Sequence, residues 1–246
     1  GGSVVGGAGA QDPYASWLRC AQDAALLHGL MQWFKRDFFR WCNKPPCCHA
    51  DCGAIGGRMD SVGVDQPTAE EVRGWASRTE VYKCRDCSRL TRFPRYNNPT
   101  TLLTSRSGRC GEFANVFCLL LRSLHLDARY VLDFTDHVWV EVWLPSLQRY
   151  VHCDPCERAL DSPLGYESGW KKKLTHVLSF SRHGVVDASP RYSRLQGGVL
   201  VRRSGDVPES LAQQVLQRKD KEMLGAFNRR TFVGGLPWDV PVSGTG

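Results

Sequence analysis

The chain has 246 residues, 42% hydrophobic and 23% charged, which is typical of a globular protein with one large domain and appendages. A net charge of +7 permits an anionic partner but excludes a polybasic nucleic-acid binder, and no apolar stretch reaches the roughly 20 residues that cross a bilayer. Because the chain begins with neither the basic nor the apolar part of a secretory signal, its eleven cysteines predict a reducing compartment, with thiols serving as metal ligands, nucleophiles or core residues.

The first part of the chain is predicted to be helical after a disordered start. Residues 1–11 are Gly-rich, and Asp12-Pro13 has the features of a helix N-terminus. Apolar residues then recur at helical spacing, at Trp17, Leu18, Ala21, Ala25 and Leu26. A second apolar-rich stretch, LMQWFKRDFFRWC, ends at NKPPC, where the two prolines stop a helix.

Two cysteine clusters mark residues 47–100 as a metal-binding subdomain. Cys84 and Cys87 form a C-x-x-C pair, and Cys52 lies about thirty residues upstream, after two adjacent cysteines. Two such pairs are typical of a tetrahedral four-cysteine zinc site, which is closed and structural because no coordination position is left for a substrate.

The first ligand of this predicted site is open. Cys48 lies nearer to Cys52 than Cys47 does, and this spacing favours Cys48, with Cys47 as the alternative and His49 as a further candidate. The predicted ligand set is Cys48, Cys52, Cys84 and Cys87.

An amphipathic helix is predicted after an irregular loop at residues 94–101. Its apolar positions follow one helix face, at Phe113, Val116, Phe117, Leu120, Leu121 and Leu124. Cys110 lies at its N-terminus, where the helix dipole and the nearby Arg106 and Arg109 favour the reactive thiolate form. Cys118 lies two turns further along and is predicted to be a core residue.

The segments on either side of the turn PSLQ predict a β-hairpin. HVWVEVWL alternates strictly, and a four-residue turn would pair Leu144 with Arg149. This register makes His137 and Asp154 diagonal neighbours on one face, within reach of an imidazole–carboxylate hydrogen bond, whereas a slip of one residue would separate them. A nucleophilic cysteine needs such a base and orienting acid, so we predict a catalytic triad of Cys110, His137 and Asp154.

Other residues of the hairpin are competing candidates. His152 lies on the same face as Asp154 and is the most plausible false base. Trp139 and Trp143 are aromatic residues of the same hairpin, and core packing is the more common role of such side chains.

The remaining segments complete a predicted division of the chain. Strands are predicted at 128–134, 173–181 and 184–189, followed by a helix that a capping box opens at Asp206. The predicted parts are a disordered start at 1–11, N-terminal helices at 12–46, the zinc-binding subdomain at 47–100, the catalytic core at 101–200, and a C-terminal helix and tail at 201–246.

Several motifs together resemble one family. GRCGEFANVF, DARYVLDFTDHVWVEVW and RYVHCDPCE, in this order, resemble the transglutaminase-like core of cytoplasmic peptide:N-glycanase. FKRDFFRWCNKPPC, KCRDCSRLTRFPRYNNP and LGYESGWKKKLTHVLSFSRHGVVDASPRYS extend the resemblance over roughly residues 30–195. It implies an α+β fold, with a papain-like core in which the nucleophile's helix packs on an antiparallel sheet. Phe113 replaces the family's Trp, and PPCCHADCG departs from its PPC-x-x-C-G pattern.

The resemblance also implies a function. Cys110, His137 and Asp154 match the family's nucleophile, base and orienting acid, and the family has a structural Zn²⁺ site at the cysteine clusters. The implied reaction hydrolyses the side-chain amide of a glycosylated Asn, releasing the N-glycan and leaving Asp. With such a substrate, Trp139 and Trp143 could stack on sugar rings if they are exposed. The implied substrates are misfolded N-glycoproteins of ER-associated degradation. Ubiquitin-shuttle or proteasome-associated proteins are candidate partners, the compartment is the cytoplasm with the nucleus as a second candidate, and neither nucleic-acid binding nor membrane insertion is expected.

Two alternatives come from other classes of protein. Some DNA-damage recognition proteins carry a transglutaminase-like domain that has lost its triad and only binds. A second alternative is another acyl-transfer enzyme on this fold, such as a protein crosslinker or a cysteine protease. The ordered triad argues against the first alternative, and the flanking motifs with the cysteine clusters argue against the second.

Overall fold

The computed structural model describes residues 13–205 and 208–233, which form two compact units. The first unit comprises the chain up to Ala128 together with Trp139–Ser162, and the second comprises Arg129–Val138 and the chain from Pro163 onward. The predicted disorder at 1–11, the cap at Asp206 and the tail after Gly234 lie outside the described residues. Among the helices of the described part, none is both long and apolar enough to span a membrane.

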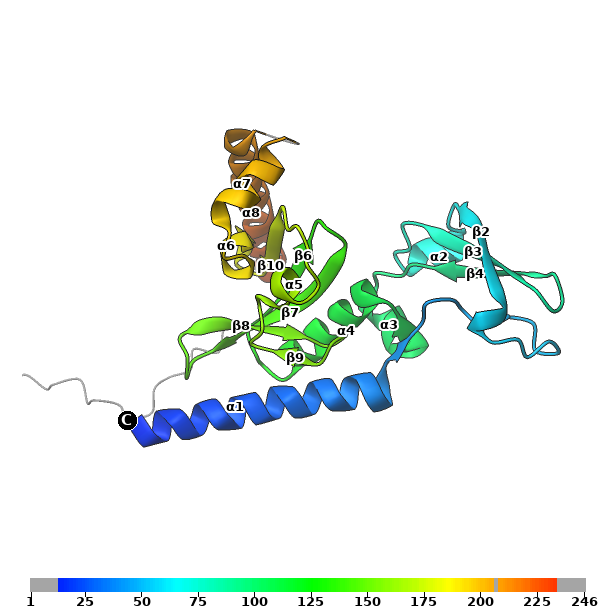
Figure 1. Cartoon of the computed structure of the whole chain (residues 1–246), viewed down its shortest axis with the longest axis horizontal. Helices are drawn as coiled ribbons and strands as arrows, with labels where there is room; N and C mark the ends of the chain where they lie inside the picture. The colour runs from blue at the N-terminus through cyan, green and yellow to red at the C-terminus, as the bar shows by residue number, and fades with distance from the viewer. Residues whose placement is uncertain (1–12, 206–207, 234–246) are drawn as a thin grey trace, which may run out of the picture. The chain divides into compact units, whose positions relative to one another are not determined.

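The first unit is mixed α and β (Figure 1). Its α-helices are α1 (Pro13–Trp33), α2 (Ala69–Arg73), α3 (Pro99–Ser105) and α4 (Cys110–Ser123), with a π-helical turn at Phe34–Phe38 and a 3-10 turn at Gly56–Arg58. Its strands are β1 (Arg40–Trp41), β2 (Met59–Asp65), β3 (Thr79–Cys84), β4 (Leu90–Pro94), β5 (Ser107–Gly108), most of β7 (His137–Leu144), β8 (Arg149–Asp154) and β9 (Ala159–Leu160).

The predicted hairpin is confirmed in its register. Strands β7 and β8 pair antiparallel with Leu144 opposite Arg149 and Val140 opposite Cys153, and β9 follows β8 in the sheet. The alternation of β7 leaves neither of its faces in solvent, since every residue of the strand except Trp143 is buried.

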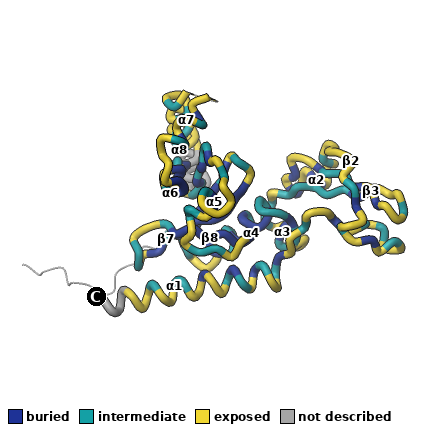
Figure 2. Tube along the Cα trace, in the orientation of Figure 1, coloured by how far each residue is buried: buried dark blue, intermediate teal, exposed yellow. Residues whose placement is uncertain are grey.

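The apolar face of α4 packs against aromatic rings that follow α1. The Phe34 ring lies 5.5 Å from the Phe113 ring and 5.1 Å from the Phe117 ring, and Phe39 lies 4.9 Å from Phe113. All four side chains are buried. Figure 2 shows α4 mainly in the colours of buried and intermediate residues. Phe113 therefore fills a core position, as expected for an aromatic on this helix face.

A separate antiparallel sheet of the order β2-β3-β4 carries the cysteine clusters; we call it, with the loop at 47–58, the metal sheet. Its alternation is interrupted by a bulge between Ser61 and Gly63, where Gly63 has a φ of 140°. Downstream, the loop predicted at 94–101 is only partly a loop. The Asn98 side chain caps α3 by accepting the Thr100 N–H, and Pro99 supplies its first turn.

The second unit combines three antiparallel strands with four helices. The strands are β6 (Ala128–Asp133), β10 (Val177–Ser181) and β11 (Gly184–Asp187), in the order β11-β10-β6. The helices are α5 (Gly165–Ser168), α6 (Ser189–Tyr192), α7 (Gln196–Ser204) and α8 (Glu209–Val233). The predicted strand at 173–181 is therefore shorter than expected, because it begins at Val177.

Candidate active site and metal centre

Cys110 is the first residue of α4 and is half-buried. The segment that leads into it is fixed by the parallel pairing of β1 with β5, in which the Arg40 N–H donates to the Arg106 carbonyl and the Cys42 N–H to the Gly108 carbonyl, each at 2.9 Å. The thiol is therefore presented at a helix N-terminus by a backbone that is held on its preceding side. Cys118 differs, because burial raises the pKa of its thiol to about 11, as expected for a core residue.

The two arginines near Cys110 in the sequence have other partners. The Arg109 guanidinium donates to both carboxylate oxygens of Glu80, at 2.9 and 2.7 Å. The Arg106 guanidinium lies 4.6 Å from the centre of the Phe38 ring. The sequence predicted that both charges favour the Cys110 thiolate, and this effect stays a prediction.

His137 and Asp154 lie at the open end of the hairpin, one on each strand. His137 is the first residue of β7 and is buried, with the Tyr166 and Trp170 rings 5.3 and 5.0 Å from its own. Asp154 is the last residue of β8 and is fully buried, and its Oδ1 accepts the backbone N–H of Cys156 at 2.8 Å. Such a hydrogen bond favours the ionised carboxylate. The contact between His137 and Asp154 stays a prediction.

The competing residues of the hairpin have structural roles. His152 is buried, its ring packs against Trp139, and its Nδ1 accepts the N–H of Ser162 at 3.3 Å. Trp139 is fully buried, so the sugar-stacking role considered for it is excluded. Trp143 is partly exposed and packs edge-on against the Tyr150 ring across the hairpin.

Four thiols converge in the metal sheet. The sulfurs of Cys47, Cys52, Cys84 and Cys87 all lie within 4.8 Å of one another. The Sγ–Sγ distances are 3.6 Å for Cys47–Cys87 and 3.6 Å for Cys52–Cys84. Because a zinc–sulfur bond of about 2.3 Å in a tetrahedron separates the sulfurs by about 3.8 Å, the four thiols fit such an ion.

The geometry places Cys47, rather than Cys48, in the cluster. Cys48 was preferred for its spacing, but its side chain is exposed and turned toward the Leu90 carbonyl, and its backbone N–H donates to the Thr91 hydroxyl at 3.1 Å. Cys47, the alternative, occupies the fourth corner of the cluster. His49 is engaged by Arg89 at 3.2 Å.

The four thiols differ in their pKa values. Backbone hydrogen bonds favour the thiolates of Cys47 and Cys52, but burial and hydrogen bonds with Cys87 outweigh them, raising the pKa of Cys47 and raising that of Cys52 to about 12. Backbone N–H groups of Cys87 and Asp86 outweigh the effect of burial and lower the pKa of the Cys84 thiol to about 7. The four cysteines pack around a small core of Ala54, Met59 and Tyr82. All eleven cysteines are free thiols.

A cavity of about 860 Å³ lies beside the segment that leads into Cys110. Its walls are formed by the stretch from Arg40 to Pro46, by residues 55–57, and by Ser105 and Ser107. The half-exposed Trp41 ring supplies an apolar surface in this wall.

Comparisons with known proteins bear on these residues. Residues 61–155 match the model of the transglutaminase-like superfamily, and residues 134–231 match that of the Rad4 transglutaminase-like domain. The chain is similar to proteins named peptide-N(4)-(N-acetyl-beta-glucosaminyl)asparagine amidase. With that of Gallus gallus it shares 44% identity over 85% of this chain and 32% of the relative, and with that of Saccharomyces cerevisiae 46% over 68% and 46%.

The chain spans a third to a half of the length of these relatives. Among solved structures, it is similar to Rad4–Rad23 crosslinked to undamaged DNA, with a TM-score of 0.55 and 15% identity over 94% of this chain and 50% of that one. A likeness at this identity concerns the fold, and it agrees with the predicted α+β transglutaminase-like class.

Proposed function

Since this chain carries a transglutaminase-like domain and is homologous to peptide-N(4)-(N-acetyl-beta-glucosaminyl)asparagine amidases, we propose that it hydrolyses the side-chain amide of glycosylated asparagine. The observation that carries the proposal is the identity of 44–46% to such amidases over two thirds or more of the chain. Fold similarity alone would leave the reaction open.

In the proposed reaction, Cys110, His137 and Asp154 form the catalytic triad. The Cys110 thiolate attacks the carboxamide carbon of the glycosylated Asn, and His137 protonates the nitrogen of the departing glycosylamine as the carbon–nitrogen bond breaks. His137 then takes a proton from water, which attacks the thioester carbon, releases the Cys110 sulfur and leaves Asp in the peptide. Asp154 holds the imidazole tautomer and stabilises the imidazolium.

The place of Cys110 at the start of α4 supports a second part of the mechanism. The oxyanion of the tetrahedral intermediate needs hydrogen-bond donors, and the unpaired backbone N–H of a residue at a helix N-terminus is such a donor. We assign the Cys110 N–H to this role, and leave the second donor unassigned.

We propose that the four-thiol cluster of Cys47, Cys52, Cys84 and Cys87 holds Zn²⁺. Four thiolates fill its coordination sphere, so the ion would stabilise the fold without contacting the substrate. The spacing of the four sulfurs supports this assignment, because it matches that of a tetrahedral zinc site.

The family likeness further supports misfolded N-glycoproteins of ER-associated degradation as substrates, in the cytoplasm or nucleus. Ubiquitin-shuttle or proteasome-associated proteins are proposed partners on the same ground.

A glycopeptide assay tests the proposed reaction. The wild-type protein is expected to release the glycan from a denatured glycoprotein and to leave Asp at the attachment site, whereas Cys110→Ala is expected to release none while keeping its circular-dichroism spectrum and metal content. Full activity in Cys110→Ala would overturn the assignment of the nucleophile.

The match of residues 134–231 to the Rad4 domain favours one second candidate, a module that binds damaged DNA. Tests of the same purified protein on glycopeptides and on duplex DNA decide between the amidase and the binding module. A wild-type protein that leaves glycopeptides intact but retains duplex DNA at moderate salt would be a binding module, whereas glycan release without DNA retention supports the amidase.

A further inference from the structure

Strand β3 connects the metal cluster to a charged group. Glu80, Tyr82 and Cys84 are spaced two residues apart on β3, so their side chains lie on the same face of the strand. Cys84 belongs to the thiol cluster, and Tyr82 packs in the small core beside it. The Tyr82 hydroxyl donates to Glu80 at 2.7 Å, so the orientation of the Glu80 carboxylate is tied to the core of the metal sheet.

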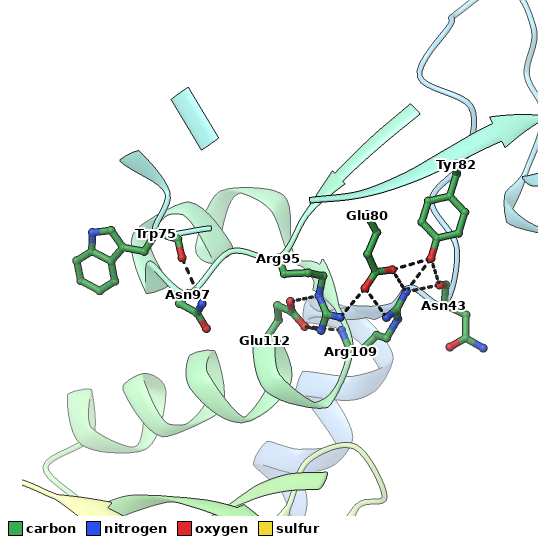
Figure 3. Close-up of polar contacts among 8 residues, drawn as sticks. All are labelled: Asn43, Trp75, Glu80, Tyr82, Arg95, Asn97, Arg109 and Glu112. Atoms are coloured by element: carbon green, nitrogen blue, oxygen red, sulfur yellow. Dashed lines mark hydrogen bonds and ion pairs between the residues drawn. The ribbon is translucent and has the colours of Figure 1, made fainter. Parts of the chain in front are cut away.

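Arg109 carries this connection to the residue before Cys110. Its guanidinium binds both oxygens of Glu80 and also donates to the Tyr82 hydroxyl at 3.0 Å and to the Asn43 carbonyl at 2.8 Å (Figure 3). Asn43 lies just before the segment that holds Cys47. The Arg109 side chain thus contacts both the strand that carries Cys84 and the segment that precedes Cys47.

Glu112 and Arg95 complete the connection on the helix side. The Glu112 carboxylate accepts the Arg109 backbone N–H at 2.9 Å and binds the Arg95 guanidinium at 2.7 and 2.9 Å. Arg95 also donates to Glu80 at 3.0 Å, so the ion pairs form one continuous network (Figure 3). The network contains equal numbers of opposite charges and is largely buried, since Glu80 is 13% exposed and Glu112 is 6% exposed.

We propose that Glu80, Arg95, Arg109 and Glu112 are positioning residues that tie the N-terminus of α4, and with it Cys110, to the metal sheet. The network holds Arg109, directly before the nucleophile, and Glu112, two residues after it, against β3 and the end of β4. Its consequence for turnover rests on the proposed amidase function, whereas its effect on the Cys110 thiol does not.

Gly108 supplies an independent sign that this junction is closely fitted. A Cβ at Gly108 would lie 2.4 Å from the Cβ of Glu112 and 2.6 Å from its Cγ. The Glu112 side chain therefore reaches the Arg109 N–H through space that only glycine leaves open at this position.

The test is the reactivity of Cys110 in Arg109→Lys, which keeps the charge but cannot reproduce the planar fork that binds Glu80, Tyr82 and Asn43. A short pulse of iodoacetamide on the folded, metal-loaded protein is followed by denaturation and isotopically heavy iodoacetamide, and mass spectrometry reads the tryptic peptide CGEFANVFCLLLR. The Cys118 thiol in the same peptide is the internal reference. We expect the Cys110 alkylation rate at neutral pH to fall about tenfold, because the thiol is no longer held in its place at the helix terminus.

Arg92→Lys is the matched control. Arg92, on β4 of the metal sheet, makes a comparable fork to Glu71 of α2, at 2.9 and 2.8 Å, and donates to the Gln66 carbonyl rather than to α4. It is expected to lower the melting temperature by a similar amount while leaving the Cys110 alkylation rate unchanged. Equal rates in Arg109→Lys and Arg92→Lys would overturn the proposal.

Glu80→Gln provides a second variant if Arg109→Lys does not fold. It removes a negative charge, so a purely electrostatic effect would raise the reactivity of Cys110, whereas loss of positioning lowers it. A raised or unchanged rate counts against the proposal.

Measurements of turnover distinguish a failure of this inference from a failure of the proposed function. For Arg109→Lys we expect kcat on a glycopeptide to fall about tenfold with little change in KM, as for a misplaced nucleophile. A wild-type protein without glycopeptide activity would refute the proposed function, while the alkylation rates would still decide the positioning role.

Discussion

The metal sheet and the core around α4 belong to the same unit but are stabilised by different interactions. In the core, large apolar side chains are fully buried, including Phe34, Phe113 and Phe117. In the metal sheet, several apolar side chains face solvent, including Val62, Val64 and Leu90, which are 53%, 66% and 56% exposed. Burial of apolar surface accounts for the first region and leaves little to stabilise the second.

Arginine–carboxylate pairs cross the metal sheet, but most are too exposed to make up for its small buried apolar surface. Arg85 with Asp60 and Arg58 with Asp86 are about half exposed, and exposed ion pairs contribute roughly 0–1 kcal/mol each. Besides the small core of Ala54, Met59 and Tyr82, the sheet has the four thiols to hold it together. We therefore expect the metal sheet to depend on the proposed zinc ion and the core to be independent of it. Cys110 lies at the junction of the two regions.

Removing a ligand is expected to have the largest effect. Cys84→Ser should lose the bound zinc and unfold the metal sheet, because structural zinc supplies about 10–16 kcal/mol to small zinc modules. Metal analysis and limited proteolysis between residues 47 and 98 measure this directly. Zinc retained with wild-type resistance to protease would show that the sheet does not need the ion.

The choice between adjacent cysteines gives the next largest effect. Cys47→Ser is expected to lose zinc, because Cys47 lies in the cluster, whereas Cys48→Ser should retain it, since the Cys48 thiol is turned toward Leu90. Metal content of the two purified variants checks this pair. Zinc lost from Cys48→Ser and kept in Cys47→Ser would restore the choice that spacing alone favoured.

A cavity in the core around α4 is expected to lower the stability of the fold without changing its zinc content. Phe117→Ala is expected to lower the free energy of unfolding by about 3–5 kcal/mol, because it removes a buried ring packed against Phe34. The zinc content should stay that of the wild type. Urea denaturation with metal analysis provides both numbers, and a simultaneous loss of zinc would mean that the two regions do not differ as described.

The smallest expected effect concerns the pH dependence of the stability that ionised Glu80 contributes to the fold. Burial opposes ionisation of Glu80, but hydrogen bonds from Arg109, Tyr82 and Arg95 outweigh it and lower the pKa of Glu80 to about 2. Because this pKa lies below the unfolded value of about 4.3, the ionised carboxylate stabilises the folded state above that pH, and the contribution is lost as pH falls toward 2.

Glu80→Gln isolates this contribution. The variant is expected to be less stable than the wild type by about 2 kcal/mol at neutral pH, with the gap narrowing as pH falls below 4.5. Urea denaturation of both proteins across this range measures the gap. A difference that stays constant with pH would mean that the charge of Glu80 does not stabilise the fold.

Much of the site region was predictable because its signals are local. The helix that begins at Cys110 follows from apolar spacing, and the hairpin register follows from alternation and the length of its turn. The strands of the metal sheet were not predicted, because a bulge and exposed valines interrupt their pattern. The helix at Pro99 was missed although Asn98-Pro99 is a capping signal.

The errors at the site concern contacts between distant residues. Arg109 was predicted to act on its neighbour Cys110, but Glu80 on a distant strand binds its guanidinium. Cys48 had the more favourable spacing, yet the path of the loop brings Cys47 to the cluster. Sequence spacing cannot distinguish two adjacent cysteines whose side chains point in opposite directions.

The most direct test of the proposed amidase is the reaction in ¹⁸O-labelled water. With a denatured glycopeptide as substrate, the wild-type protein should convert the glycosylated Asn to Asp carrying one ¹⁸O in its side chain, because water resolves the Cys110 thioester, and Cys110→Ala should leave the glycopeptide unchanged. Glycan release by Cys110→Ala at the wild-type rate, or an unmodified glycopeptide after incubation with the metal-loaded wild type, would contradict the account.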